Sequence, residues 1–346
     1  MGKHRLRLGA LVTGVVLTLA ACGGSGGGSD NTAVDGEWDE VVAAANEEGS
    51  VLLYSSHNPV NLEALKTAFE AEYPDISMEF VRGTDAELNP KVEVENQTGQ
   101  GAADVHMVTD TAWINSAIES EAYSVDLLGP EFDTENYQAD GMVKGDKFAL
   151  MSIAVFALGW NTDTYSKGLE DVPDVIDPSL EGKIGIVNPS GIAVYVDLYR
   201  YLEKTYGEDF LTDLADLNPR VYPSALGIAQ ALTSGEVSAA PIVNTLVNDV
   251  AAGAPVDWKL APKPWGAPWY THVLSAAQHP NAAQVLANFM ATKAGQTALS
   301  AGYGSTLPDI EGAVATADQV TLADASDLTP EDVAKFSAEW EELFIQ

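Results

Sequence analysis

The sequence predicts an α/β protein folded into two lobes. Short apolar stretches of strand length alternate with stretches whose apolar residues recur at helical spacing, a pattern typical of parallel sheets covered by helices. The chain has 346 residues, more than one hydrophobic core normally holds together, so two lobes are expected. The sequence contains no repeat of fixed period.

The N-terminal residues are expected to form an export signal over 1–21. Lys3, Arg5 and Arg7 precede an apolar run that is too short to span a bilayer, which needs about 20 residues. The ending Leu-Ala-Ala-Cys at 19–22 resembles a bacterial lipobox, in which the cysteine is lipidated and becomes the first mature residue. The alternative is a plain signal peptide.

Cys22 is therefore the expected lipidation site. It is also the one cysteine of the chain, so no intramolecular disulfide can form. Residues 22–35 begin with a run rich in glycine and serine, which predicts a flexible linker between the anchor and the folded body.

The composition is strongly acidic. The chain carries 17 Lys and Arg against 51 Asp and Glu, a net charge of −34. Phosphate contacts need basic clusters, so we expect no nucleic acid as a partner. An acidic surface attracts cationic ligands, but it is also typical of salt-adapted and secreted proteins, and charge alone does not separate these explanations.

Strand and helix signals alternate over the first half of the chain. The apolar run over 49–55 is bounded by turn formers and predicts a strand. Asn58 and Pro59 are typical of a helix start, and helical spacing follows until Pro74 forbids continuation. Further elements are expected as strands over 76–81 and 103–108, with a helix over 90–97 between them.

A long apolar segment over 148–160 leads into a second α/β unit. Ser224 and Gly235 are expected to start and stop a short helix there. Pro262, Pro264 and Pro268 are expected to break the pattern that follows. The remaining elements are predicted as strands over 183–187, up to 243 and over 271–276, and as helices from 191 past 206, from 281 and over 329–344.

Six stretches carry a resemblance to a known family. They are VLLYSSH over 51–57, ADV over 103–105, LGWNT over 158–162, GKIGIVNPSG over 182–191, AQALTSGE over 229–236 and AGQ over 294–296. In this order they resemble the type II periplasmic-binding proteins, the substrate receptors of ABC importers, and among them the ferric-iron-binding branch.

The resemblance implies a periplasmic-binding-protein-like fold of type II. In that fold two α/β lobes are joined by two crossing hinge strands, here expected near 149–155 and 265–273, and the ligand lies in the cleft between the lobes. The expected lobes are 36–151 with 266–306, and 152–265 with 307–346. Open α/β sheets bind ligands at the carboxyl ends of their strands, and closure around the ligand is the expected motion.

The resemblance also makes ferric iron a candidate ligand. Ferric-binding members hold the metal with two adjacent tyrosines on the loop after a second-lobe strand, aided by a histidine and a glutamate from the first lobe. Here that loop is 242–248, which contains Asn244 and no tyrosine. His57 is shifted by one from the family's histidine position, and the glutamate position reads Thr109-Asp110.

A different feature favours an anion. The loop Pro189-Ser190-Gly191-Ile192 stands at a strand-to-helix junction, where free N–H groups and the helix dipole attract negative charge. In the family the matching positions hold an accessory anion or a ligand phosphate or phosphonate. The alternative is an ordinary capped helix start.

A second set of donors is expected from the facing lobe. Ser55, Ser56 and His57 precede the predicted Asn58 cap and would face the 189–192 loop across the cleft. Two such helix ends would form an anion clamp. The alternative is a simple strand–loop–helix turn.

Aromatic residues mark the expected second crossing. Trp265, Trp269 and Tyr270 would line the cleft as a wall that suits an apolar or cationic part of a ligand, or would serve hinge packing. Tyr195 and Tyr199 are spaced four apart on one helix face, which is typical of packing but also offers a displaced phenolate pair for iron.

These observations predict a receptor and not an enzyme. The chain has no HExxH, no Cys/His dyad with its lone cysteine lipidated and no credible nucleophile elbow, and no cofactor is expected. The expected partners are a small-molecule ligand, an ABC permease and the membrane through the Cys22 anchor, with the protein acting as a monomer on the cell surface or periplasmic face.

Three ligand classes are left open. A small anion, such as a phosphate ester, phosphonate, sulfonate or carboxylate, ranks first. Ferric iron or an iron chelate ranks second, and a polyamine-like or thiamine-like cation ranks third.

Overall fold

The computed structural model describes residues 32–345. The expected signal peptide, Cys22 and most of the expected linker lie outside the described residues. Within 32–345 no helix has the length and apolar character needed to cross a bilayer.

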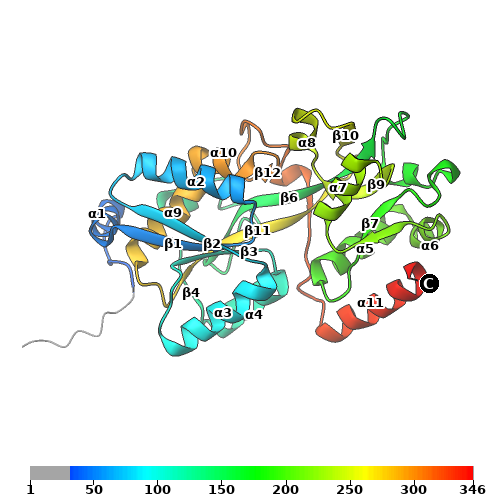
Figure 1. Ribbon diagram of the computed structural model, residues 1–346. Coiled ribbons are helices and arrows are strands. Elements are labelled where there is room, and N and C mark those ends of the chain that lie inside the picture. Colours follow the sequence, from blue (N-terminus) through cyan, green and yellow to red (C-terminus); the bar gives the residue numbers. More distant parts are fainter. Residues whose placement is uncertain (1–31, 346) are drawn as a thin grey trace, which may run out of the picture. The chain divides into compact units, whose positions relative to one another are not determined.

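One large sheet runs through the described chain (Figure 1). Its main path is β13-β12-β6-β11-β3-β1-β2, in which β1 pairs in parallel with β2 and β3, and β11 runs antiparallel to β3 and β6. The strands of this path are β1 (Ser50–Ser55), β2 (Ser77–Arg82), β3 (Val105–Val108), β6 (Phe148–Asn161), β11 (Trp265–Leu274), β12 (Gly304–Ser305) and β13 (Ala315–Thr316).

Shorter strands complete the β structure. Two of them, β9 and β10, pair with the far end of β6, while β7 and β8 form a separate parallel pair. Their bounds, with those of the remaining short strands, are β4 (Ser124–Val125), β5 (Val143–Lys144), β7 (Gly185–Val187), β8 (Arg220–Tyr222), β9 (Ala239–Asn244), β10 (Val256–Lys259) and β14 (Thr321–Leu322).

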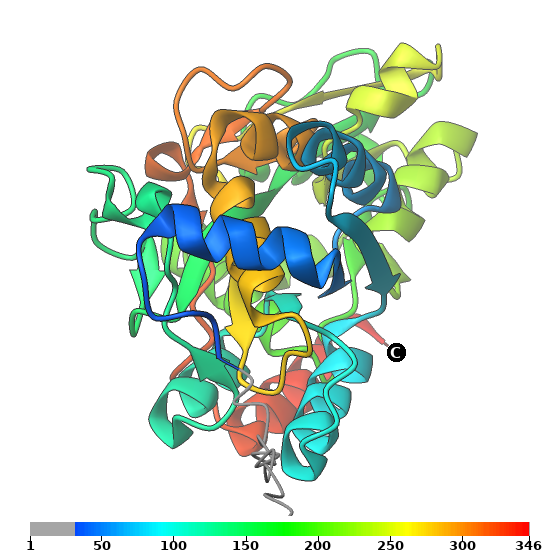
Figure 2. The same cartoon turned by 90° about the vertical axis from the view of Figure 1, so that its left-hand side faces the viewer.

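Helices cover the sheets. Figure 1 shows α2, α9 and α10 above the first strands and α3 and α4 below them, and Figure 2 shows α1 crossing over α9. The helices are α1 (Trp38–Glu48), α2 (Pro59–Glu72), α3 (Asp85–Thr98), α4 (Thr111–Ser120), α5 (Ala193–Tyr206), α6 (Phe210–Ala215), α7 (Ala225–Ser234), α8 (Val247–Ala251), α9 (Pro280–Ala291), α10 (Lys293–Ser300) and α11 (Pro330–Phe344).

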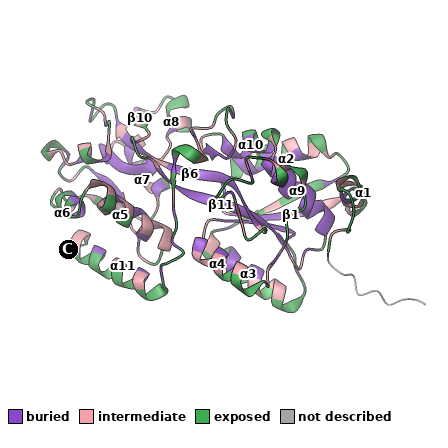
Figure 3. Cartoon of the chain, turned by 180° about the vertical axis from the view of Figure 1, so that it is seen from behind, coloured by how far each residue is buried: buried purple, intermediate pink, exposed green. Residues whose placement is uncertain are grey.

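Two large hydrophobic cores share the hinge strands. On β6, Ile153 belongs to the first core and Leu158 to the second. On β11, Trp269 belongs to the first core and Trp265 to the second. Figure 3 shows buried residues along the length of both strands. The prediction of an α/β fold with two crossing hinge strands is confirmed.

The expected lobe boundaries stay a prediction. The C-terminal tail was expected to pack on the second lobe from residue 307. Val320 still belongs to the first core, and Ala323 is the first tail residue in the second. The reason is pairing: β13 and β14 join β12 and β11 before the tail leaves toward α11.

The predicted helix caps are confirmed. Asn58 Oδ1 accepts the Val60 N–H at 2.9 Å, with Pro59 in the first turn of α2. Ser224 Oγ accepts the Gly227 N–H at 3.2 Å to start α7, which ends at Gly235 with φ 75°.

One helix begins earlier than expected. The helix predicted over 90–97 spans Asp85–Thr98, because Thr84 and Glu87 form a capping box that starts it before Pro90. Pro90 lies inside the helix, where its missing N–H removes one backbone hydrogen bond. The early start places Asp85 in the first turn.

One strand also begins earlier than expected. The strand predicted over 271–276 starts at Trp265 and contains Pro268. At Pro268 the strand pairs with Ile153 of β6, whereas β3 joins on the other side only from Tyr270. Proline is tolerated because one side of β11 carries no ladder at that residue.

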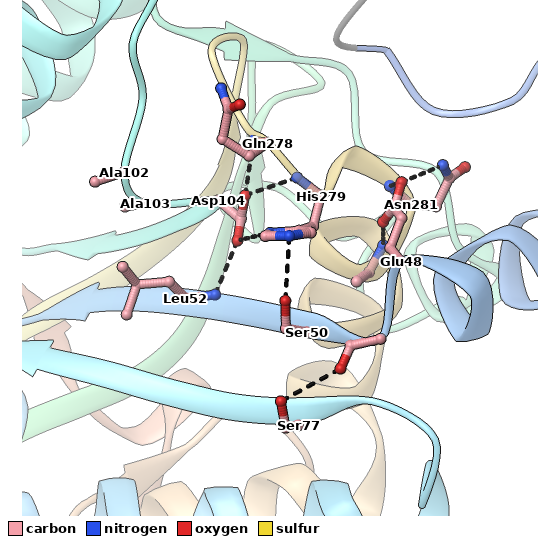
Figure 4. Close-up of polar contacts among 12 residues, drawn as sticks. Glu48, Ser50, Leu52, Ser77, Ala102, Ala103, Asp104, Gln278, His279 and Asn281 are labelled. Atoms are coloured by element: carbon pink, nitrogen blue, oxygen red, sulfur yellow. Dashed lines mark hydrogen bonds and ion pairs between the residues drawn. The ribbon is translucent and has the colours of Figure 1, made fainter.

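A polar cluster ties the first sheet to the turn before α9 (Figure 4). Asp104 is fully buried. Its Oδ1 accepts the backbone N–H groups of Gln278 and His279 at 2.8 and 2.9 Å, and its Oδ2 accepts the Leu52 N–H at 2.9 Å and lies 3.0 Å from His279 Nδ1. Ser50 Oγ lies 3.1 Å from His279 Nε2. One carboxylate therefore joins β1, β3 and the β11–α9 turn.

We expect Asp104→Asn to lower the free energy of unfolding by about 2–3 kcal/mol or more, because an amide nitrogen cannot accept bonds that the carboxylate oxygens accept. Urea titration measures the change. Asp163→Asn, which makes the same charge change at an exposed turn residue, is the control and should shift stability by under about 0.5 kcal/mol. Equal effects at both positions would contradict this account.

Three buried histidines lie in or beside strands of the large sheet, since His57 follows β1 and His106 of β3 pairs with His272 of β11. His106 Nδ1 lies 3.0 Å from His272 Nε2, and His272 Nδ1 lies 2.8 Å from Ser124 Oγ. His57, His106 and His272 are each fully buried. Burial lowers the pKa of His57 and of His106 to about 3, and lowers the pKa of His272 well below its ordinary value. All three are therefore neutral in the folded protein.

We expect acid to destabilise the protein through these rings. The unfolded chain takes up a proton on each histidine below about pH 6.5, whereas the folded chain does not until near pH 3. Stability should therefore fall with pH in that window by up to about 1.4 kcal/mol per pH unit for each ring. Urea titrations at pH 7 and pH 5 measure the slope, which His106→Asn should make shallower. An unchanged slope in that variant would count against a neutral buried ring.

Candidate functional site

The carboxyl ends of β1, β2 and β3 meet at one edge of the sheet, as parallel strands require. Ser56 follows β1, Asp85 lies beyond β2 and Thr109 follows β3. Thr109 donates its backbone N–H, at 2.9 Å, and its hydroxyl to Asp85 Oδ2. The hinge strand β11 reaches the same edge, since Trp269 Nε1 donates to Ser56 Oγ at 3.0 Å. We call Ser56, Asp85, Asn89, Thr109 and Asp110 the strand-end cluster.

Acceptors outnumber donors in this cluster. Asp110 caps α4 by accepting the Trp113 N–H at 3.1 Å, and its second oxygen accepts Asn89 Nδ2 at 3.4 Å. Asp85 Oδ1 and Asn89 Oδ1 are buried and accept no hydrogen bond of ordinary geometry. Burial raises the pKa of Asp85, and the Asp110 charge raises it further, while Thr109 and the Ser56 hydroxyl oppose the rise.

Two of the three predicted first-lobe donors are used within the protein. Ser55 is fully buried, and its hydroxyl oxygen accepts the His57 N–H at 3.1 Å. His57 Nδ1 accepts the Asn58 N–H at 2.8 Å, so the ring proton lies on Nε2 and donates to Ser152 Oγ at 3.2 Å. His57 therefore supports the hinge and presents no free nitrogen, whereas Ser56 and Thr109 remain at the edge.

Two indoles stand four residues apart on β11. Trp269 contacts the His57 ring at 4.3 Å and the Tyr303 ring at 5.6 Å between centroids. Trp265 lies 5.5 Å from Phe156, and its Nε1 donates to Asp197 Oδ2 at 3.0 Å. Both indoles are under 10 % exposed. Hinge packing, the alternative to an aromatic wall, accounts for these contacts.

Tyr270 and Asn244, two further residues predicted to bind the ligand, differ in burial. Tyr270 is 2 % exposed, and its hydroxyl donates to the Gly141 carbonyl at 3.0 Å. It therefore faces the first lobe's interior. Asn244 ends β9 opposite Phe156 of β6 and is partly exposed.

The predicted anion loop has its N–H groups occupied. The N–H of Ser190 donates to Asn188 Oδ1 at 2.8 Å, and that of Ile192 donates to the Pro189 carbonyl at 2.9 Å. The Gly191 N–H points to Ser337 Oγ at 3.4 Å.

The Ser190 hydroxyl is occupied as well. It donates to Glu341 Oε1 of α11 at 2.6 Å. The N–H groups of this loop and the Ser190 hydroxyl are therefore engaged within the chain, with a carboxylate beside them, and the anion clamp stays a prediction.

The tyrosine pair on α5 does not offer two phenolates. Tyr199 is buried and donates its hydroxyl to the Val187 carbonyl at 2.5 Å. The Tyr195 hydroxyl is bonded by the Ala225 backbone, and burial raises the pKa of both tyrosines. Within residues 32–345 no group of three or more His, Cys, Asp and Glu side chains is arranged to hold a metal ion.

The Ser50–His279–Asp104 cluster has the order of partners found in a Ser-His-Asp triad. It stands at the amino end of β1, whereas Ser56 follows its carboxyl end. The Asp104 carboxylate is shared among backbone N–H groups of the turn before α9. We assign this cluster to the fold.

Sequence reasoning missed Asp85 and Asn89. Both lie on α3, whose start was placed too late. The signal that could have found them is the T-x-x-E pattern at 84–87, a capping box directly after a predicted strand.

Comparison with known proteins agrees with this architecture. The model of the family described as "Bacterial extracellular solute-binding protein" matches residues 55–297. No curated protein matches the chain in sequence.

Solved structures share the fold at low identity. The fructose-6-phosphate-bound periplasmic binding protein AfuA from Actinobacillus pleuropneumoniae is 19 % identical, with a TM-score of 0.66 over 86 % of this chain and 99 % of AfuA. Iron-bound HitA from Pseudomonas aeruginosa is also 19 % identical, with a TM-score of 0.63 over 86 % of this chain and 99 % of HitA.

A third structure is the Atu4243 GABA receptor. It is 16 % identical, with a TM-score of 0.62 over 86 % of this chain and 98 % of the receptor. With two α/β cores joined by β6 and β11 and a family match over most of its length, the chain belongs to the bacterial extracellular solute-binding proteins, with the type II fold of ABC-importer receptors.

Proposed function

We propose that this protein is the lipid-anchored receptor of an ABC importer and that it captures a cationic small solute between its lobes. The hinge strands β6 and β11 let the two lobes close on the solute. The observation that carries the ligand class is the excess of acceptors in the strand-end cluster, where Asp85 Oδ1 and Asn89 Oδ1 are buried and accept no hydrogen bond of ordinary geometry.

An anion, the first-ranked class from sequence, has less support. The N–H groups of the 189–192 loop donate within the chain, and Glu341 adds a negative charge beside them. Asp85 and Asp110 would repel an anion at the facing edge.

Ferric iron also has less support. The 242–248 loop has no tyrosine, and Tyr195 and Tyr199 are committed to bonds within the second lobe.

The related structures are compatible with a cationic solute. Their titles name a sugar phosphate, iron and GABA, so one fold accommodates different charges. GABA carries an ammonium group, which makes an amine a reasonable solute for this architecture.

We expect a thermal-shift panel on protein lacking residues 1–29 to respond to polyamines and other organic cations. A ligand at 100 times its Kd adds about 2.7 kcal/mol of stability, which raises the melting temperature measurably. Phosphate esters, phosphonates, sulfonates, carboxylates and ferric citrate complete the panel. A shift confined to an anion would overturn the cationic assignment, and a shift confined to ferric citrate with charge-transfer colour would favour iron.

We expect Cys22→Ser to release the protein from the membrane. The lipobox cysteine would carry the acyl chains, and the serine hydroxyl would not be modified. Fractionation of the host bacterium measures the share of protein in the membrane pellet, and Ser25→Ala in the linker is the matched control. Membrane association that survives Cys22→Ser would contradict lipid anchoring.

A further inference from the structure

We propose that the strand-end cluster recognises a primary ammonium group, with Asp85 Oδ1 and Asn89 Oδ1 as its acceptors. This inference rests on the proposed function, a receptor for a cationic solute, and names which kind of cation the site selects.

The two acceptors form a pair. Asp85 and Asn89 are four residues apart on α3, so their side chains project from the same helix face. Both Oδ1 atoms are buried, and the Asn89 residue is 5 % exposed. A buried acceptor without a donor costs free energy, about 1–3 kcal/mol, which a bound N–H donor would recover.

Most donors around these oxygens are committed to other acceptors. Thr109 donates its backbone N–H and its hydroxyl to the other oxygen of Asp85, Oδ2. Asn89 donates Nδ2 to Asp110 Oδ2. This bond orients the Asn89 amide so that its carbonyl oxygen, Oδ1, points away from Asp110. The Ser56 hydroxyl is the remaining donor nearby, and it offsets the burial of Asp85 only in part.

The strand-end cluster holds two carboxyl groups and no basic side chain, which favours a cation over an anion. The negative charge of Asp110 acts on Asp85. Both carboxyl groups accept hydrogen bonds from neutral groups, Asp85 from Thr109 and Asp110 from the Trp113 N–H. Burial without a cationic partner raises the pKa of Asp85, and an ammonium group beside Oδ1 would oppose that rise.

The chemistry separates primary from quaternary amines. A primary ammonium has three N–H donors, whereas a quaternary ammonium has none and is held by the open faces of aromatic rings. The nearby Trp269 face is covered by His57 and Tyr303, and Trp265 is covered by Phe156. The site therefore has free acceptors for N–H groups and no open aromatic cage.

Calorimetric titration with matched probes tests this assignment. The protein is the mature chain from residue 22 with Cys22→Ser. The probes are putrescine and 4-aminobutyrate, each compared with its fully trimethylated ammonium analogue. We expect at least one primary amine to bind, and its trimethylated analogue to bind at least about 10-fold more weakly, because the lost bonds are charge-assisted.

Three variants locate the site. Asp85→Asn should weaken binding of the primary amine by about 10- to 100-fold, which is the loss of one charged hydrogen bond. Asn89→Leu keeps the charge and removes the second acceptor, and it should also weaken binding. Asp75→Asn makes the same charge change at an exposed first-lobe residue outside α3, and it should leave the Kd within about twofold.

The outcomes separate the inference from the proposed function. Equal or tighter binding of the trimethylated analogues would overturn the primary-amine assignment and leave a cation receptor. Unchanged affinity in Asp85→Asn and Asn89→Leu, with both variants folded by circular dichroism, would place the amine elsewhere. Binding of none of the four probes would overturn the inference, and a response of the protein to anions alone would overturn the proposed function as well.

Discussion

The antiparallel pairing of β6 with β11 is the constraint on which the rest of the structure depends. Each strand runs from one hydrophobic core into the other, so their backbone ladder is the frame that both lobes share. A shift of one residue in that register would turn every side chain on one strand to the opposite face. Trp265 and Trp269 would then leave the two cores that they now complete.

The same strands position the candidate site. Trp269 is held between His57 and Tyr303, and its indole N–H reaches Ser56 at the end of β1. His57 in turn donates to Ser152 on β6. The hinge is thereby connected through direct side-chain contacts to the edge where Ser56 and Asp85 meet.

The hydrogen bonds distinguish the 189–192 loop, which the sequence predicts as an anion site, from the strand-end cluster, of which it missed two residues. The 189–192 loop has the sequence of an anion site, yet Asn188 and Glu341 supply acceptors from inside the chain. The strand-end cluster has no recognisable motif, yet Asp85 and Asn89 keep oxygens without donors. Burial makes such unsatisfied oxygens costly, and a bound N–H donor would recover that cost.

The sequence alone determined the elements and their order. Periodicity, the Asn58 and Ser224 caps and the Gly235 stop are local signals, since they act within a few residues of the chain. The two crossing strands could also be predicted, because the family order of motifs carries the topology. Local reasoning failed at Pro90 and Pro268, where a capping box and a one-sided ladder make proline acceptable.

Only the tertiary structure decided which polar groups are free. Glu341 lies 151 residues from Ser190, and Ser152 lies 95 residues from His57. No local pattern reveals that such distant groups satisfy each other. Long-range pairing therefore decides which polar groups can bind a ligand. A donor that the fold places beside an acceptor of the same chain is no longer free to bond to a ligand.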